Sequence, residues 1–157
     1  MGVEQVKKFF EERKINKKIV FFDKSTENSL KASETLGVAQ GQIAKSILFL
    51  ADGEPFLIII SGDKRVDEKR IKKLTLAKKV RMAKPDEVYN ITGFEVGGVS
   101  PVGHKRNLKV YIDESLKRYD EVYPAAGEYN NMFPTNFYEL VELTNGIVVN
   151  VAKEIEK

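Results

Sequence analysis

The sequence predicts a single α/β domain with a mixed, largely buried sheet. The chain has 157 residues, the size of one domain, and 42% of them are hydrophobic. Helical and strand-like patterns are interspersed along the chain. Two apolar runs flank Asp52-Gly53, a strong turn signal, and predict a hairpin. Because we find no repeat, linker or low-complexity segment, residues 1–157 are expected to form one domain.

The first elements follow from spacing and capping residues. Apolar residues in 3–13 recur at helical spacing and predict an amphipathic helix. Residues 18–23 (KIVFFD) predict a short strand. Ser25 or Thr26 is expected to cap a second helix that stops at Gly37.

The predicted hairpin spans residues 43–61. Its second run, Phe56 to Ile60, is apolar at every position, so both faces of that strand are expected to be covered. Pro85 suits the first turn of a later helix that ends before Gly93. The other expected elements are a helix from Asp67 to Leu74, strands over 80–83, 108–112, 122–126 and 146–152, a turn or helix capped by Asp113, and a helix over 136–143 capped by Thr135.

Composition excludes several kinds of site. The chain has no cysteine, so disulfides and thiolate nucleophiles are excluded. With His104 as the sole histidine, we expect neither a metal site nor a cofactor. No apolar run approaches the roughly 18 residues that cross a membrane, and the charged N-terminus is not typical of a signal peptide. We therefore expect a cytoplasmic protein.

Positive charge is concentrated in one part of the chain. The formal net charge is only +3, yet residues 63–84 hold ten Lys or Arg against three acidic residues. Such a block, which includes Lys64 and Arg65, can follow a phosphate backbone. From charge alone, the pattern is more typical of a solvated helix and its flanks.

The stretch EVGGVSPVGHKRN, residues 95–107, concentrates backbone freedom between a predicted helix and a predicted strand. Gly97 and Gly98 can adopt positive φ and allow a ligand to approach the main chain, while Pro101 biases Ser100 toward an extended conformation. The amides of Gly98, Val99 and Ser100 could then point at a carbonyl oxygen, an oxyanion or a phosphate. The alternative is a wide turn without function.

Lys45 shares a strand face with apolar residues in IAKSILF, and the opposite face is apolar too. A buried ammonium is costly unless it is paired or binds an anion. Lys45 therefore either serves a site or lies at an open strand end and extends its head into water. His104 sits beside Lys105 and Arg106 and is expected to be exposed, as a surface residue or a minor substrate contact.

Several segments in order resemble a known family. These are IAKSILFL around Lys45, KPDEVYNITGFEVGGVSPVG at 84–103, VYIDESL at 110–116, and AAG at 125–127. Together they resemble the YbaK/ProX-type aminoacyl-tRNA deacylases, free-standing relatives of the editing domain inserted in bacterial prolyl-tRNA synthetases. The resemblance covers roughly residue 20 to the end.

The resemblance implies a mixed sheet curled like a barrel, with helices outside. It implies a trans-acting, metal-independent hydrolase that cleaves the ester of a mischarged tRNA, with tRNA(Pro) carrying cysteine, alanine or another small residue as the expected substrate. The expected partners are aminoacylated tRNA and prolyl-tRNA synthetase. The alternatives are a non-catalytic module that binds a nucleotide, tRNA or a synthetase, and a small esterase with a non-RNA substrate.

The resemblance also implies site residues. The strand lysine matches Lys45, which would position the terminal nucleotide or polar groups of the substrate, and the GxxxP loop matches residues 97–101. The candidate catalytic groups are Lys45, Gly97, Gly98, Val99, Ser100 and Pro101. The candidate substrate-binding residues are Ser46, Gly103, His104, Ala126 and Gly127. The candidate contacts to the tRNA backbone are Lys64, Arg65, Lys105 and Arg106.

Two departures bear on specificity. Relatives that hydrolyse alanyl esters carry an Asn directly after the strand lysine, where this chain has Ser46. They also carry a His late in the domain, where this chain reads EYNNMF after Gly127. These differences count against an alanyl-tRNA substrate.

Overall fold

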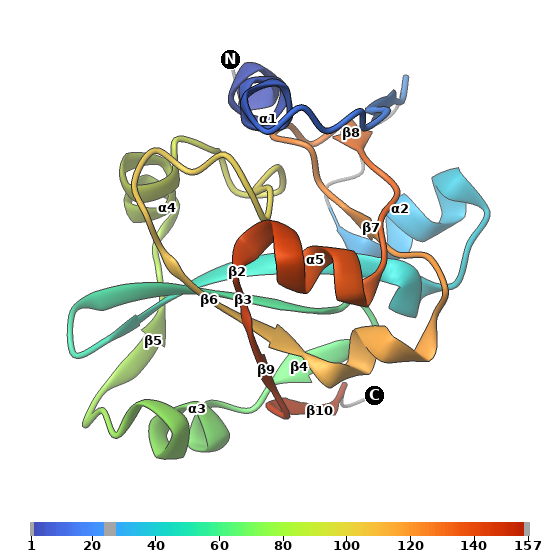
Figure 1. The fold of residues 1–157 in the computed structure, drawn as a ribbon. Coiled ribbons are helices and arrows are strands. Elements are labelled where there is room, and N and C mark those ends of the chain that lie inside the picture. The colour runs from blue at the N-terminus through green and yellow to red at the C-terminus, as the bar shows by residue number, and fades with distance from the viewer. Residues whose placement is uncertain (1, 24–27, 156–157) are drawn as a thin grey trace.

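The computed structural model describes residues 2–23 and 28–155. Within these residues the chain forms a six-stranded mixed sheet with helices on both faces (Figure 1). The helices are α1 (Gly2–Glu12), α2 (Ser29–Leu36), α3 (Glu68–Thr75), α4 (Pro85–Thr92) and α5 (Phe137–Thr144), with 3₁₀ turns η1 (Gln40–Gln42) and η2 (Glu114–Arg118). The strands are β1 (Val20–Phe21), β2 (Ile43–Ala51), β3 (Glu54–Ser61), β4 (Lys64–Val66), β5 (Val80–Met82), β6 (Lys109–Asp113), β7 (Tyr123–Pro124), β8 (Asn131–Met132), β9 (Ile147–Val149) and β10 (Ala152–Glu154).

The predicted hairpin is the centre of the sheet. β2 and β3 pair antiparallel around Asp52 and Gly53, which both have positive φ, as a type I′ turn requires. β6 and then β9 add parallel strands beyond β3, and β5 pairs antiparallel with β2. In the described residues this path ends at β5 and β9, so the sheet is open there. The barrel-like curl remains a prediction.

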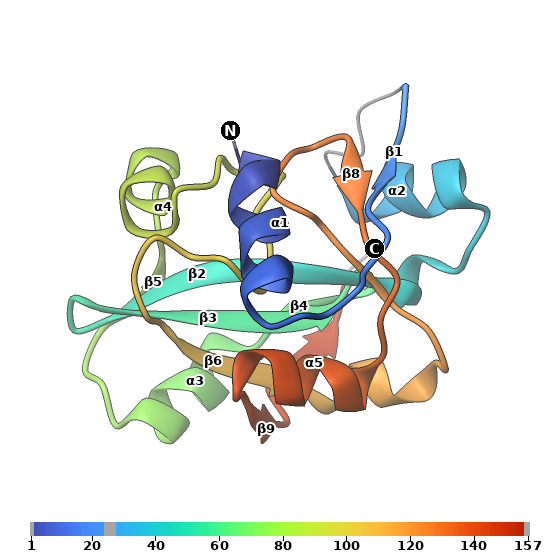
Figure 2. The ribbon, with the colours of Figure 1, turned by 45° about the horizontal axis from the view of Figure 1, so that its top comes forward.

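β3 is buried on both faces, as its continuous apolar run predicted. Leu57 and Ile59 belong to a core cluster that also contains residues of α1, α4 and α5. Ile58 and Ile60 belong to a second cluster on the opposite face, beneath α3. Figure 2 shows α1 and α4 above the sheet and α3 below it, and Phe137 and Leu140 of α5 belong to the same core cluster as the residues of α1 and α4. The period-two alternation of one strand thus supplies both cores.

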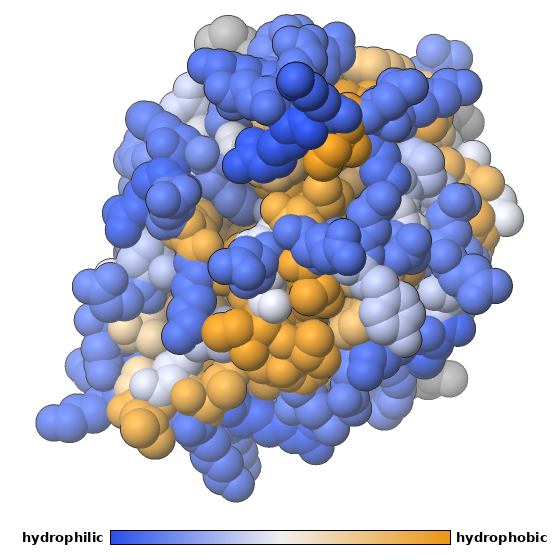
Figure 3. Space-filling model, in the orientation of Figure 1, coloured by the Kyte–Doolittle hydropathy of each residue, from blue (hydrophilic) through white to orange (hydrophobic). Residues whose placement is uncertain are grey.

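The face near β9 carries one of the apolar areas of the surface (Figure 3). Figure 3 shows apolar atoms over the region where β9 lies, surrounded by hydrophilic residues. Ile147 and Val148 of β9 are among the exposed large hydrophobic side chains. β9 is also the last strand of the described sheet on this side.

Two helix caps differ from expectation. Ser25 and Thr26, the expected caps of α2, lie outside the described residues, and Asn28 is the N-cap, its side chain accepting a hydrogen bond from the Lys31 amide at 2.9 Å. Thr135 was predicted to cap α5, but the cap is Asn136, which accepts from the Glu139 amide. The Thr135 backbone instead pairs with Val122, which leaves the next residue to cap the helix.

The strand predicted over 146–152 is two strands. β9 pairs parallel with β6, whereas β10 turns away and pairs antiparallel with β4. Buried Asp113 fixes this change of direction, because its carboxylate accepts hydrogen bonds from the amides of Val151 at 2.7 Å and Ser115 at 2.9 Å. Asp113 therefore caps η2, as predicted, and also holds the C-terminal segment.

Replacing Leu57 with alanine tests the double-sided core. Leu57 is fully buried between helices and sheet, so Leu57→Ala should lower the free energy of unfolding by about 2–5 kcal/mol. Leu76→Ala is the matched control, because Leu76 is 88% exposed and surface changes usually stay within about 0.5 kcal/mol. Urea denaturation of both variants provides the measurement, and equal losses would contradict the assignment of the core.

Candidate active site

A gap in the pairing of β2 opens the candidate site. On its outer edge β2 pairs with β7 at Ile43 and Ala44 and with β5 from Phe49 onward. In the described part of the chain, residues 45–47 have no strand partner on this edge. A pocket of about 410 Å³ lies here, a size ordinary for small-molecule sites. Its lining residues are Asn28, Ser29, Ile43, Ala44, Lys45, Ser46, Ile47, Val96, Gly97, Val99, Ala125 and Met132.

The two glycines of the 95–100 loop are needed for different reasons. Gly97 has a φ of 95°, in the region that favours glycine. Gly98 lies so close to the neighbouring chain that a Cβ there would meet the Cα of Glu128 at 2.7 Å. Gly97 therefore sets the direction of the loop and Gly98 allows it to pack. Both features bring the loop main chain to the pocket edge beside β2.

The loop amides only partly fulfil the prediction. The Gly98 amide donates to the Glu95 carbonyl at 3.0 Å and closes a turn, so it does not point at a ligand as expected. Among the described residues no acceptor is paired with the N–H of Val99 or Ser100. Of the three predicted donors, Val99 lines the pocket and remains a candidate to bind a ligand oxygen, whereas Ser100 is fully buried and is not a lining residue.

Lys45 lines the pocket and is partly buried. Its ammonium donates to the Lys64 carbonyl at 2.6 Å. Burial lowers the pKa of Lys45 from its usual value, and nearby Asp63 opposes this shift. The side chain therefore has one fixed backbone partner rather than a carboxylate salt bridge. An ammonium with two further N–H donors suits an oxygen-rich ligand.

Asp63, whose charge acts on Lys45, belongs to an ion pair with Arg118. Arg118 donates to both its carboxylate oxygens, at 2.6 and 3.1 Å. Burial would raise the pKa of Asp63, but the hydrogen bonds and charge of Arg118 outweigh it, so the pKa is lowered. Asp63 thus stays ionised and committed to Arg118, which leaves Lys45 available to a ligand.

Ser46 adds an unpaired hydroxyl to the pocket. Its Oγ is buried and has no hydrogen-bond partner in the described structure. A buried hydroxyl without a partner costs free energy, and a ligand oxygen or N–H in the pocket would satisfy it. This supports the expectation that Ser46 contacts substrate.

His104 corrects one prediction, because it is half-buried rather than exposed. Its ring packs edge-on against Phe94, and its Nε2–H donates to the Ser100 carbonyl at 2.7 Å. Burial lowers the pKa of His104, and this hydrogen bond opposes the shift only in part. His104 therefore braces the loop instead of facing water.

The other predicted residues do not gather in this pocket. Ser100 and Ala126 are fully buried. Gly98 and Gly127 line an adjacent hollow. A third groove, of about 590 Å³ between α1 and α5, is lined by Pro101, Gly103, His104, Lys105 and Arg106 among others. Gly103 and His104 are thus separated from Lys45, contrary to a single substrate pocket.

Lys64 and Arg65 lie on β4, which pairs with β10 and not with the six-stranded sheet. The Lys64 ammonium pairs with Glu154. These two basic residues and the pair Lys105 and Arg106 therefore belong to different parts of the surface.

Several lining residues were not predicted. Asn28 and Ser29 reach the pocket because α2 begins there, and Met132 because β8 crosses nearby. Ile47 could have been found, since it shares the strand with Lys45 and Ser46. Val96 could also have been predicted, because it directly precedes Gly97 in the glycine-rich motif. Met132 had no sequence signal, because a lone apolar residue in a short strand is indistinguishable from core.

No group of three or more His, Cys, Asp or Glu side chains in the described residues could hold a metal ion. The same part of the chain contains no helix long and apolar enough to cross a membrane. The polar residues that line the pocket are Asn28, Ser29, Lys45 and Ser46.

An open-edged strand carrying a lysine beside a glycine loop is the arrangement expected from the sequence motifs, and comparison with known proteins gives the family. The model of the aminoacyl-tRNA editing domain matches residues 23–143. The chain belongs to this family.

Known relatives extend the likeness over the whole chain. A crystal structure titled "putative trans-editing enzyme for prolyl tRNA synthetase" superposes with a TM-score of 0.91 and 34% identity over 97% of each chain. The uncharacterized protein YwhH of Bacillus subtilis is 34% identical over 99% of this chain and all of its own.

Two relatives carry names that describe an activity. EbsC of Enterococcus faecalis, named "Putative Cys-tRNA(Pro)/Cys-tRNA(Cys) deacylase", is 29% identical over 73% of this chain and 70% of its own. A proline–tRNA ligase of Lactobacillus gasseri is 40% identical over 62% of this chain, which is 17% of the ligase. The match is thus to one segment of a much longer synthetase.

The pH dependence of stability tests the burial of His104. In the folded protein the pKa of His104 lies below the usual 6.5. As the pH falls below 6.5, the unfolded chain therefore binds a proton more readily than the folded chain does. The contribution of His104 to the free energy of unfolding is thus complete above pH 6.5 and declines below it. His104→Gln should therefore lose less stability than the wild type between pH 7.5 and 5. Urea unfolding at both pH values measures this, and identical losses would show that His104 titrates normally.

Proposed function

We propose that the protein is a trans-acting aminoacyl-tRNA deacylase that hydrolyses the ester of a mischarged tRNA. The observation that carries this proposal is the convergence of Lys45, Ser46 and the Gly97–Val99 loop on one pocket. Membership of the editing-domain family and the named activities of its relatives support it.

The reaction needs little more than orientation and charge stabilisation. An aminoacyl ester is already labile, so placing a water molecule and binding the developing oxyanion can supply the acceleration. The Val99 amide would bind the ester oxygen, and the Lys45 ammonium would hold polar groups of the terminal ribose or amino acid. The Ser46 hydroxyl would orient the substrate at the opposite wall. No side-chain nucleophile or metal is required in this scheme.

We infer a small amino acid as the group removed, because apolar Ile43, Ile47 and Met132 confine the pocket. Ser46 in place of Asn counts against alanine. The relative EbsC is named as a deacylase of cysteinyl-tRNA, which favours cysteine. The likeness to prolyl-tRNA synthetase segments makes tRNA(Pro) the first tRNA to test and the synthetase a candidate partner. We place the reaction in the cytoplasm, where tRNA is charged.

The acceptor stem would be held by basic side chains outside the pocket. Lys105 and Arg106 are exposed, and they share a groove with Lys8 of α1 and with Arg13, which directly follows that helix. Phosphate contacts of this kind predict tRNA affinity that falls with rising salt. We favour this group over Lys64 and Arg65, since the Lys64 side chain is already paired with Glu154.

Changing Lys45 tests the proposed chemistry. The protein would be incubated with tRNA(Pro) charged separately with cysteine, alanine, serine and proline, and ester loss followed with time. We expect selective loss of one mischarged species, with kcat/KM lowered about 100-fold or more in Lys45→Ala, as for loss of one preorganised donor. Lys153→Ala, an exposed strand lysine in β10, is the matched control and should retain activity.

The same variants separate an enzyme from a binding module. If Lys45→Ala still binds tRNA but no longer hydrolyses it, the lysine acts in catalysis. If the wild type removes none of a full set of amino acids above the spontaneous rate while tRNA still binds, the protein is a module that binds charged tRNA without turnover.

A further inference from the structure

A second hollow lies directly behind the glycine loop. It has a volume of about 350 Å³ and is lined by Gly2, Tyr89, Gly93, Glu95, Val96, Gly98, Gly127, Glu128, Tyr129 and Asn130. Val96 lines both this hollow and the candidate ester pocket, and consecutive residues Gly97 and Gly98 line one each. A ligand bound at the ester pocket therefore needs to cross only the 96–98 turn to enter the hollow.

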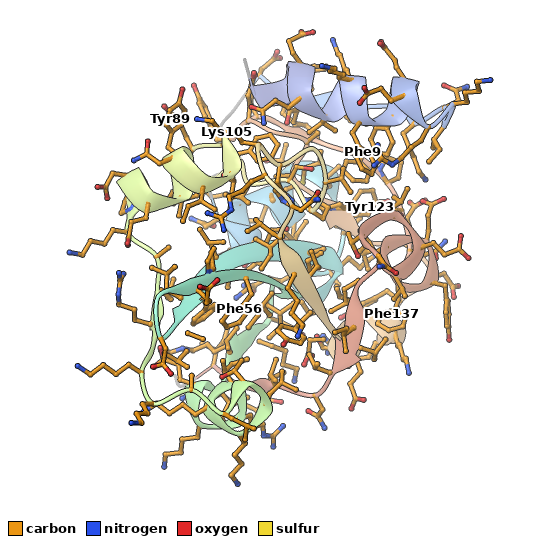
Figure 4. The ribbon with its side chains drawn as sticks, turned by 60° about the vertical axis from the view of Figure 1, so that its left-hand side comes forward. Phe9, Phe56, Tyr89, Lys105, Tyr123 and Phe137 are labelled. Atoms are coloured by element: carbon orange, nitrogen blue, oxygen red, sulfur yellow. The ribbon has the colours of Figure 1, made fainter. Side chains whose placement is uncertain are left out.

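The rim of the hollow carries exposed apolar and aromatic side chains. Tyr89 is 47% exposed, Tyr129 56% and Val96 59%. They come from three separate segments: the last turns of α4, the 127–130 loop and the glycine loop. Figure 4 shows Tyr89 on the side of α4 that faces the N-terminal end of α1, away from the sheet. Exposed apolar side chains gathered from distant segments around one hollow are typical of a binding surface.

The charge of the hollow excludes phosphate as its occupant. Among the described residues that line it, Glu95 and Glu128 are acidic and none is Lys or Arg. Aromatic rings with nearby hydrogen-bond acceptors suit an uncharged, flat, amino-bearing ring instead. Asn130 contributes such an acceptor, because its Oδ1 is buried without a hydrogen-bond partner in the described structure.

We propose that this hollow is a base subsite, in which Tyr89 and Tyr129 stack on the terminal adenine of the unpaired RNA 3′ end. The inference rests on the proposed function, because the ribose of that nucleotide carries the ester bound on the other side of the turn. Stacking on tyrosine binds the base independently of the RNA sequence next to it. The acceptors of Glu95 and Asn130 favour the exocyclic amino group of adenine. The hollow thereby holds the adenine, which is joined to the scissile ester through a single ribose ring.

Fluorescence of a labelled RNA tests the subsite without requiring catalysis. The probe is a short RNA that ends in unpaired CCA with 2-aminopurine in place of the terminal adenine, whose emission is quenched when it stacks. Quenching by the wild type should be lost in Tyr89→Ala and in Tyr129→Ala and retained in Tyr89→Phe, which keeps the ring. Tyr138→Ala is the matched control, because Tyr138 is also an exposed tyrosine, 70% accessible, and lies on α5 away from the hollow.

Deacylation of mischarged tRNA supplies the second readout. Each Tyr→Ala change should lower kcat/KM about 5- to 150-fold, mainly through KM, which is the usual cost of losing one base-stacking ring. Tyr89→Phe and Tyr138→Ala should stay near the wild type. Thermal unfolding should be unchanged in all four variants, since the rings are exposed.

The outcomes distinguish this inference from the proposed function. If probe quenching is the same in both Tyr→Ala variants as in the wild type, the base subsite is wrong, whatever Lys45→Ala does to hydrolysis. If the wild type hydrolyses no charged tRNA but quenches the probe through Tyr89 and Tyr129, the proposed function fails and the base subsite stands. Loss of quenching in Tyr138→Ala would also overturn the assignment to this hollow.

Discussion

The burial of β3 on both faces is the constraint on which the rest of the structure depends. Its alternate residues supply two separate cores, so β3 must lie inside the sheet with β2 and β6 as neighbours. β2 therefore lies one strand in from the edge of the sheet, between β3 and β5. Because β5 and β7 each cover only one end of its outer edge, the middle of β2 remains open at Lys45 and Ser46. The candidate site is thus a consequence of incomplete pairing beside a fully buried strand.

The proposed site would use fixed polar groups in place of strong catalytic side chains. Lys45 is held by a backbone carbonyl, and the nearest carboxylate, Asp63, is bound by Arg118. Its ammonium is therefore not neutralised by a direct salt bridge, and the surrounding burial makes any interaction with a ligand oxygen stronger than in water. The glycine loop beside it packs closely on the 127–130 segment at Gly98, and in the proposed scheme this packing would hold the Val99 amide in place. Such preorganised donors suit the cleavage of a labile ester.

The sequence predicted what depends on local pattern. The hairpin, the two-sided burial of Phe56–Ile60 and the helix from Pro85 follow from apolar spacing and turn residues, and the structure confirms them. Lys45 and Gly97 were recognisable because each breaks the local pattern, one as a charge in an apolar strand and the other in a glycine cluster. The pocket that contains them was implied by the family resemblance rather than by either residue alone.

What the sequence could not give depends on contacts between distant segments. The burial of His104 arises from packing against Phe94, and the division of 146–152 into β9 and β10 arises from Asp113 binding the Val151 amide. Likewise, the separation of Gly103 and Lys105 from Lys45 follows from the position of α1 over the loop, where Gln5 donates to the Gly103 carbonyl at 3.0 Å. No local pattern encodes these partners.

The central claim is that the open edge of β2 and the glycine loop together hold the ester. The most direct measurement is amide NMR of ¹⁵N-labelled protein titrated with a non-hydrolysable analogue, a 3′-amide-linked aminoacyl adenosine. The account predicts the largest shifts at the Lys45, Ser46 and Val99 amides, with small changes near His104. Shifts confined to the groove between α1 and α5, with the β2 edge and the loop unperturbed, would contradict it.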